Sequence, residues 1–332
     1  MRGLIRIVLL VLLVPAVAAG WDAHGHRMVT YTALDLLPGE APAWLREADV
    51  RRQIAYQSNE PDRWRATRSD VLAHENGPDH YIDVERLERF GLDLSTLPRR
   101  RYEYALLLSR AGDAAGDSEQ GGDDAQADPT KDWPGFLPYA IAEHYAKLRS
   151  SFSTLRILKK LNDPARQDQL AAARANVIHE MGQLSHFVGD AAQPLHNTIH
   201  HHGWIGPNPH GYTTDHAFHR KIDGGVAALH AITTETLKAY RTPMASIDPG
   251  GAWKAALSEI QRSFDQVTPL YELERRGDLE RDAGRDFIAA RLADGASVLA
   301  GMYWSAYRDA EPTKDQIKGF VRYNNLKADA AH

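Results

Sequence analysis

The stretch RQDQLAAARANVIHEMGQLSHFVGDAAQPLH, residues 166–196, decides the fold class of this chain. Its apolar residues recur at spacings of 7, 4, 3 and 4: Leu170, Val177, Met181, Leu184 and Val188. These spacings place them in one continuous stripe along a helix. The pattern therefore predicts a long amphipathic helix over 166–192, ended by the proline at 194, with its apolar stripe facing the core.

The same segment carries a second, polar stripe. Its members follow at spacings of 4, 3 and 4: His179, Gln183, His186 and Asp190. His186 lies about 200° around the helix from Leu184. A solvated helix face usually carries Lys, Glu and Arg, and none of these stands on the stripe. A metal-binding face is one interpretation, and an ordinary solvated face is the other.

Histidine and aspartate recur at helical spacing. His186 and Asp190 stand at i and i+4, so on a helix they can bind one ion or two adjacent ones. His196 follows the proline that turns the chain back, and His219 with Asp223 repeats the i, i+4 pair. This pattern indicates a metal site, with chance placement among 16 histidines as the alternative.

Helical periodicity continues through the rest of the chain. Near the C-terminus it is carried by Ile288, Leu292, Leu299 and Tyr303. We expect further helices at 26–37, 41–58, 99–111, 136–161, 216–241 and 251–270. The acidic, Gly- and Ala-rich stretch 112–132 has no periodicity and predicts an exposed loop. Because no alternating β pattern is found, residues 21–332 are expected to form one all-α domain.

Residues 1–20 are typical of a secretory signal peptide: two arginines, a short apolar run and a small-residue end. Export to the periplasm or out of the cell is therefore expected. Cleavage after Gly20 would leave a free amine on Trp21, with His26 five residues along. Such an amine has a pKa of roughly 7.7–8 and can chelate zinc with its own carbonyl. A frayed chain end is the alternative for Trp21.

Composition limits the chemistry that the site can use. The net charge of −5 becomes −7 without the two leader arginines, so bulk charge indicates no nucleic-acid or anionic-membrane partner. The chain has no cysteine, which excludes disulfides and thiolate metal sites. Any zinc ion must be held by imidazole, carboxylate and backbone groups.

Two upstream residues complete an ordered set of candidate ligands: Asp62 in SNEPDRWR and His80 in DHYIDVE. In chain order the set is Trp21, His26, Asp62, His80, His186, Asp190, His196, His219 and Asp223. With it, the chain resembles the superfamily of three-zinc phosphodiesterases. That superfamily contains bacterial phospholipase C and the single-strand-specific nucleases of the S-one/P-one type. The resemblance is densest in LSHFVGDAAQPLH, residues 184–196.

The resemblance implies three zinc ions per chain. The first would be bound by Asp62, His80, His186 and Asp190. The second would lie close by, on the Trp21 amine and carbonyl, His26 and the shared Asp190. The third would be bound by His196, His219 and Asp223, with open positions for water or phosphate. A hydroxide between the close pair forms near neutral pH, because zinc lowers the pKa of bound water to about 7.

The resemblance also implies which residues carry catalysis: Asp62, Arg65 and the bridging Asp190. Arg65, three residues after Asp62, matches the arginine that the nuclease branch directs at the phosphate. A surface cation is the alternative for Arg65. The third zinc ion would take the leaving oxygen, so no protonated general acid is needed.

Several features resemble the nuclease branch more closely than the lipases. The histidine follows Trp21 closely, the last ligand is aspartate, and the gap between His196 and His219 is long. Tyr81 could stack on a base and Asp83 could accept a hydrogen bond from the base edge; core packing is the alternative for Tyr81. The loop 197–217 lacks the Gly- and Asn-rich stretch of the nuclease pocket. Its histidines are expected to be loop residues, not ligands: His200, His201, His202, His210 and His216.

The expected function is zinc-dependent hydrolysis of single-stranded DNA or RNA by a monomer without a protein partner, with 3′-nucleotides as further substrates. One alternative is a phospholipase C acting on phosphatidylcholine-like lipids. It predicts an exposed apolar rim in the loops flanking His80 and His196, where Trp204 and Ile205 are candidates. The other alternative is a non-catalytic zinc-binding protein, which predicts a missing ligand, and none is missing.

Overall fold

The computed structural model describes residues 21–115 and 130–325. The predicted signal peptide lies outside the described residues, as do residues 116–129 of the predicted acidic loop. The described residues form helices and turns without a strand, which confirms the all-α prediction. Among them, no helix combines the length and apolar character needed to cross a bilayer.

The helices follow one another along the chain as α1 (Ala23–Leu36), α2 (Ala48–Gln57), α3 (Glu60–Arg65), α4 (Asp70–Asn76), α5 (Arg101–Ala115), α6 (Leu137–Leu161), α7 (Gln167–Ala192), α8 (Phe218–Arg220), α9 (Val226–Leu229), α10 (Thr234–Leu237), α11 (Ala252–Phe264), α12 (Val267–Arg276), α13 (Asp282–Arg308) and α14 (Lys314–Tyr323). Short 3-10 turns lie between them: η1 (Ala43–Arg46), η2 (Gly77–His80), η3 (Val84–Phe90), η4 (Pro164–Arg166), η5 (Pro194–His196) and η7 (Lys238–Tyr240). One turn, η6 (Lys221–Gly225), is a π-helix.

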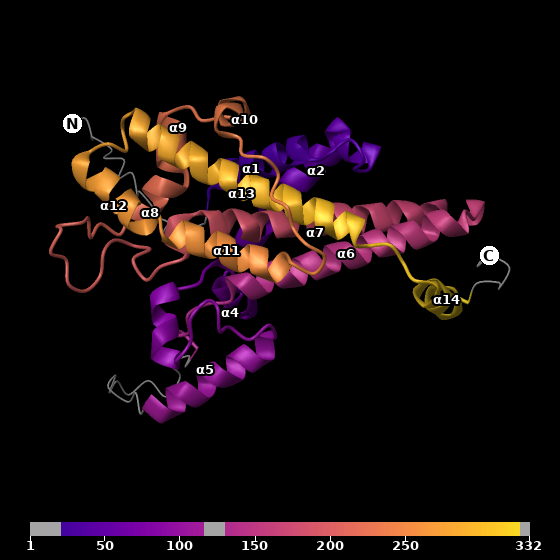
Figure 1. The fold of residues 1–332 in the computed structure, drawn as a ribbon, viewed down its shortest axis with the longest axis horizontal. Helices are drawn as coiled ribbons and strands as arrows, with labels where there is room; N and C mark the ends of the chain where they lie inside the picture. Colours follow the sequence, from indigo (N-terminus) through magenta and orange to yellow (C-terminus); the bar gives the residue numbers. More distant parts are fainter. Residues whose placement is uncertain (1–20, 116–129, 326–332) are drawn as a thin grey trace, which may run out of the picture.

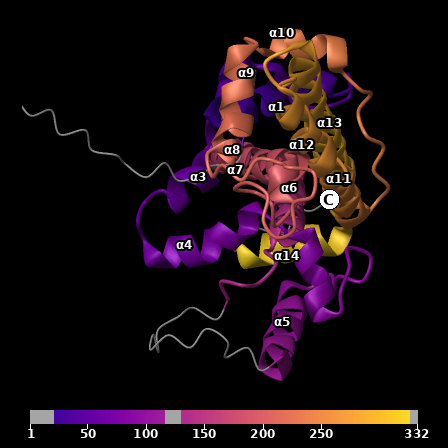
Figure 2. The same ribbon diagram turned by 90° about the vertical axis from the view of Figure 1, so that its left-hand side faces the viewer.

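Helix α7 is the centre of the molecule. It lies alongside α6 and also packs against α2, α11 and α13, while α13 covers α1 (Figure 1). Helices α4 and α5 form a lobe at the edge of this body: α5 extends below it in both ribbon views, and α4 lies beside it in Figure 2. The apolar stripe of α7 faces the core as predicted, with Val177, Met181 and Leu184 fully buried.

The C-terminal half of α7 is buried on all sides. Every residue from Met181 to Ala192 is buried, including His186 and Asp190 on the polar stripe. Glycine permits this close packing, because a Cβ on Gly189 would lie 2.9 Å from His26 Nδ1 of α1. The interpretation of the polar stripe as a solvated face is therefore wrong: this face lies inside the protein.

Three predicted helices are interrupted. The segment 41–58 divides at Glu47, whose backbone is extended (φ −61°, ψ 130°). The segment 251–270 divides into α11 and α12, because Pro269 cannot donate a hydrogen bond to the carbonyl of residue 265. The segment 216–241 breaks into short helices around η6 and the left-handed Ala231 (φ 47°). Helix α5 continues to Ala115, four residues beyond its predicted end.

Candidate metal centre

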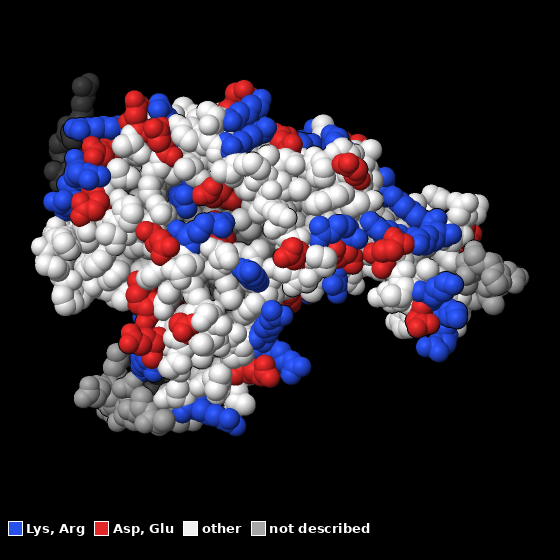
Figure 3. Space-filling view, viewed as in Figure 1, with Lys and Arg blue, Asp and Glu red and all other residues white. Residues whose placement is uncertain are grey.

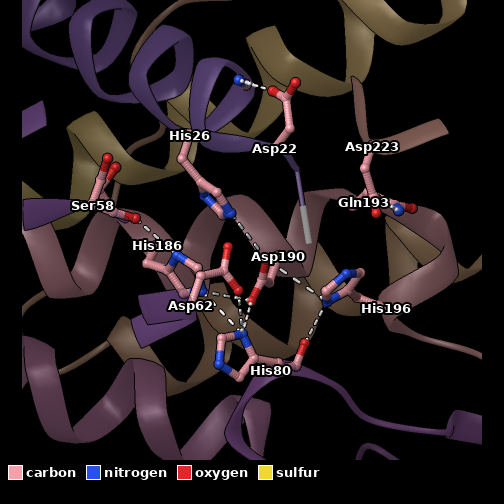
Figure 4. A network of polar contacts seen from close by, with 12 residues as sticks. Asp22, His26, Ser58, Asp62, His80, His186, Asp190, Gln193, His196 and Asp223 are labelled. Carbon is pink, nitrogen blue, oxygen red and sulfur yellow. Dashed lines mark hydrogen bonds and ion pairs between the residues drawn. The ribbon is translucent and has the colours of Figure 1, made fainter. Parts of the chain in front are cut away.

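The structure brings the predicted histidine and aspartate ligands together beside the C-terminal half of α7 (Figure 4). They come from seven elements of the chain. The contributions are His26 from α1, Asp62 from α3, His80 from η2, His186 and Asp190 from α7, His196 from η5, His219 from α8 and Asp223 from η6. Their ligand atoms form three groups, each within 4.8 Å: His26 with Asp62 and His186; His80 with His186 and Asp190; and His196 with His219 and Asp223.

Asp190 lies between the groups and contacts histidines through both carboxylate oxygens. Its Oδ2 lies 3.0 Å from His80 Nδ1 and 3.3 Å from His186 Nε2. Its Oδ1 lies 3.5 Å from His26 Nε2 and 3.7 Å from His196 Nδ1. A carboxylate in this position can bridge two cations, which is the role that the sequence resemblance implies for it.

The third group has the same members as the third predicted site. The Nε2 atoms of His196 and His219 are 3.1 Å apart, and His219 Nε2 lies 3.4 Å from Asp223 Oδ1. Gln193 donates from Nε2 to Asp223 Oδ1 at 2.7 Å and so orients this carboxylate. The sequence analysis did not single out Gln193, although it stands three residues before His196.

Backbone carbonyls orient three of the histidine rings. His186 Nδ1 donates to the carbonyl of Ser58 at 2.8 Å, and His219 Nδ1 donates to that of His201 at 3.1 Å. His196 Nδ1 donates to the carbonyl of His80 at 2.5 Å. Because a carbonyl can only accept, Nδ1 carries a proton in each ring, so in the neutral ring Nε2 is the lone-pair donor that faces the cluster. Metal-binding histidines are held in this way.

Several buried atoms of the cluster lack a hydrogen-bond partner within the described protein. They are both ring nitrogens of His26, His80 Nε2 and Asp190 Oδ1. Buried polar atoms are normally hydrogen-bonded, and each orphan costs roughly 1–3 kcal/mol. A cation between His26 Nε2 and Asp190 Oδ1, which lie 3.5 Å apart, would satisfy both of these atoms. Imidazole and carboxylate ligands around small buried spaces suit zinc, so the residues present fit the implied metal.

Burial and neighbouring charges together set the charge states of the cluster. It lowers the pKa of His26 from 6.5 to about 3 and that of His80 to about 4, so both rings are neutral at pH 7. Burial opposes ionisation of Asp190, but His186 outweighs it and holds the pKa of Asp190 well below its ordinary value. Burial also lowers the pKa of His186, yet Asp190 and Asp62 outweigh this effect and raise it. Neutral imidazole and ionised carboxylate are the metal-binding forms. His26, His80 and Asp190 are in these forms at pH 7, whereas burial raises the pKa of Asp223 well above its ordinary value.

A pocket of about 310 Å³ lies beside the cluster and is lined by His80, His196, His219 and the cation Arg65. The Arg65 side chain is only 17% exposed, so it is not an open-surface cation. Its Nη2 donates to Asp62 Oδ1 at 2.9 Å, while its Nε is buried without a partner. Arg65 therefore has a free donor in the immediate neighbourhood of the cluster.

Asp83 and Tyr81 line the same pocket. Asp83 Oδ2 accepts from Arg86 Nε at 3.0 Å, and Asp83 Oδ1 is buried without a hydrogen-bond partner. Burial raises the pKa of Asp83 to about 7, with Arg86 opposing the rise. The Tyr81 ring also packs closely against the backbone at Gly135, where an added Cβ would lie 2.8 Å from Tyr81 Cδ2. Tyr81 therefore both lines the pocket and packs against the neighbouring backbone.

Trp21 is fully buried, so a frayed chain end is excluded. Its side chain packs against α1, where a Cβ on Gly25 would lie 2.8 Å from Trp21 Cβ. The next residue is tied to the third group, since the amide of Asp22 donates to the carbonyl of Asp223 at 3.1 Å. Chelation by the Trp21 amine stays a prediction.

The histidine-rich loop contributes to the pocket wall. His201 and His202 line the pocket, whereas His200 stacks on Trp204 with ring centroids 3.8 Å apart. None of the loop histidines belongs to the three metal-ligand groups found among the described residues. Arg86 was not among the predicted site residues, although it follows Asp83 by three residues, as Arg65 follows Asp62.

Comparison with protein-family models gives no match, and comparison with curated proteins gives none either. The functional assignment therefore rests on the chemistry of the site itself.

Proposed function

We propose that this protein is a zinc-dependent phosphodiesterase that hydrolyses single-stranded DNA and RNA, with 3′-nucleotides as further substrates. The observation that carries the proposal is Arg65, a largely buried cation with an unpartnered Nε beside a buried histidine and carboxylate cluster. A guanidinium in such a place is suited to bind a phosphate oxygen.

Individual side chains of the cluster and the pocket would have distinct roles in the hydrolysis. Asp62 orients Arg65 through its 2.9 Å hydrogen bond, and Arg65 would hold a non-bridging phosphate oxygen. Asp190 would be shared between two ions, with the surrounding imidazoles fixing its orientation. When bound, the metal ions would supply activated water and stabilise charge on the phosphoryl oxygens. Burial of the cluster excludes competing bulk water from these ligands.

Asp83 favours a nucleic-acid substrate over a simple phosphate ester. Its Oδ1 is a buried acceptor without a partner, in the pocket wall next to Tyr81. A base could stack on the tyrosine ring and donate an amino hydrogen to Asp83, which would relieve the cost of leaving that oxygen unpaired. A choline head group offers no N–H donor for this oxygen.

A phospholipase C is the second candidate, supported by exposed apolar side chains on the α4–α5 lobe. Val71 of α4 is 70% exposed, while Tyr102 and Leu106 of α5 are 86% and 50% exposed. Ile205, named above as a rim candidate, is also 50% exposed, whereas Trp204 is partly buried against the core. Such side chains could contact a lipid surface.

The test compares single-stranded DNA, RNA, a 3′-nucleotide and phosphatidylcholine as substrates of the mature zinc-loaded protein. Arg65→Gln and His186→Gln should abolish nucleic-acid hydrolysis. Their matched controls are Arg63→Gln, an arginine of the same helix paired with Glu60, and His230→Gln, whose Nε2 contacts the carbonyl of Leu279. Faster turnover of phosphatidylcholine than of nucleic acid would favour the lipase. No turnover of any substrate would favour a non-catalytic zinc protein.

A further inference from the structure

A second cavity adjoins the pocket of the metal centre. It has a volume of about 180 Å³ and is called here the aromatic cavity, after Tyr102, Trp133 and Phe136 in its wall. Two backbone segments line both hollows. In the first, Gly77 and His80 face the pocket while Pro78 and Asp79 face the aromatic cavity. In the second, Lys131 faces the pocket while Thr130 and Trp133 face the cavity. The two hollows are thus immediate neighbours.

The wall of the aromatic cavity is made of flat groups. The rings of Trp133 and Phe136 have centroids 5.9 Å apart. The guanidinium of Arg101 lies over the Phe136 ring at 5.3 Å and is held by a 2.6 Å ion pair with Asp79. Arg101 Nε is buried without a hydrogen-bond partner. Tyr102 is 86% exposed, so its ring is free to contact a ligand that enters the cavity.

Basic residues belong to the wall of the aromatic cavity or lie close to it in the sequence. Arg99 and Arg100 immediately precede Arg101, and the Arg100 side chain is 82% exposed. Lys131 and Arg65 line the pocket at the metal centre, and Lys131 follows Thr130 of the cavity wall in the sequence. Figure 3 shows basic and acidic side chains together on the lobe of α5, as over the rest of that face. A phosphate backbone leaving the pocket towards the aromatic cavity would pass Lys131 and Arg101, with the carboxylates of Glu75 and Asp79 also in the cavity wall.

We propose that the aromatic cavity binds a second base of the substrate, beyond the nucleotide that occupies the pocket at the metal centre. The inference rests on the proposed nuclease function and specifies its substrate: a single strand long enough to reach both hollows. Aromatic faces next to a cationic track are how proteins bind single strands without reading their sequence. The cavity is concave and contains the Asp79–Arg101 ion pair, which suits a planar polar ring better than acyl chains.

The experiment removes the exposed members of this surface. Tyr102→Ala and Arg100→Gln are compared with matched controls on other helices: Tyr323→Ala, an equally exposed tyrosine of α14 (87%), and Arg52→Gln of α2. For each zinc-loaded protein, kcat and KM are measured on a single-stranded decanucleotide and on a 3′-nucleotide, which has one base and cannot occupy both hollows. Binding of a phosphorothioate decanucleotide and of phosphatidylcholine vesicles is measured in parallel.

Wild-type protein should have a lower KM for the decanucleotide than for the 3′-nucleotide. Tyr102→Ala should raise the decanucleotide KM roughly fivefold or more, the equivalent of about 1 kcal/mol of stacking, and weaken phosphorothioate binding similarly. The 3′-nucleotide constants should not change. Equal decanucleotide constants in Tyr102→Ala and Tyr323→Ala would overturn the inference, while hydrolysis of the decanucleotide by both variants would uphold the nuclease. If Tyr102→Ala lost only vesicle binding, the surface would be assigned to lipid. A wild-type protein without nuclease activity would refute the proposed function itself.

Discussion

Asp83 presents one carboxylate oxygen to Arg86, and its other oxygen is buried in the pocket without a hydrogen-bond partner, 3.9 Å from His201 Nδ1. If a base edge donates to this oxygen, Asp83→Ala should weaken polynucleotide cleavage by about 1–3 kcal/mol and shift base preference. Hydrolysis of bis-nitrophenyl phosphate, which has no base, should stay nearly unchanged. The control is Asp132→Ala, which removes a more exposed carboxylate near the same arginine.

Two outcomes would count against this role of Asp83. An equal loss on both substrates would mean that Asp83 positions His80 and supports metal binding instead. Phosphatidylcholine turnover above nucleic-acid turnover, in a ratio that the variant leaves unchanged, would favour the lipase.

Trp21 gives a second prediction at the residue scale. If its amine chelates zinc, a methionine placed before it should abolish most activity, because an amide nitrogen cannot replace a free amine as ligand. The helical fold should persist, since the buried indole packs against α1 in either case. Circular dichroism and nuclease assays of the two mature proteins test this. Full activity in the extended protein would refute chelation by the amine.

Residue types and spacing were sufficient to identify the side chains that the structure gathers into buried clusters. They could not identify the groups that orient these side chains. The carbonyls of Ser58, His80 and His201 hold histidine rings, yet a carbonyl is present at every residue and leaves no trace in the sequence. The position of Arg65 inside a pocket likewise depends on how α3 packs, which spacing does not determine.

At the scale of elements, α7 and α1 must approach closely for His26 to reach Asp190. A Cβ on Gly189 would lie 2.9 Å from His26 Nδ1, so Gly189→Ala should displace this ring. We expect roughly a tenfold or greater loss of metal affinity, as for other changes that disturb ligand orientation. Gly319→Ala of α14 is the control, because its Cβ would meet nothing within 4 Å.

The control should be stabilised by about 0.5–1 kcal/mol, since alanine favours a helix interior over glycine. Metal titration of each variant, followed by thermal unfolding, separates the two effects. Unaltered metal affinity in Gly189→Ala would show that metal binding does not depend on the present position of the His26 ring.

The long helices α6, α7 and α13 could be predicted because each carries a continuous apolar stripe against the core. The segment 216–241 could not, because its local propensity is helical while its packing demands a π-turn. In this segment Gly224 leaves room for the Asp22 side chain, because a Cβ on Gly224 would lie 2.3 Å from the Asp22 carboxylate. Helix α14 was missed because it is short and only Val321 is buried on it.

For the whole molecule, metal should contribute much of the stability. Metal sites in small domains provide on the order of 10 kcal/mol, and this chain has no cysteine to form a disulfide. EDTA should therefore lower the melting temperature by many degrees. An unchanged melting curve, with metal removal confirmed by elemental analysis, would contradict this.

Acid should lower stability further in the metal-free protein. The pKa values of His26 (about 3) and His80 (about 4) lie below the ordinary 6.5, so the unfolded chain binds more protons between these limits. The free energy of unfolding should then fall as the pH drops from about 6.5 towards 4. Denaturant unfolding at a series of pH values measures this slope.

The most direct test of the account is a zinc titration of EDTA-stripped protein, followed by hydrolysis of single-stranded DNA. We expect no hydrolysis without metal, and activity that rises with added zinc and saturates near three equivalents per chain. Elemental analysis of the saturated protein should give the same number. Full hydrolysis of DNA by protein shown to contain no metal would contradict the central claim that the buried histidine and aspartate cluster is a metal centre for phosphodiester cleavage.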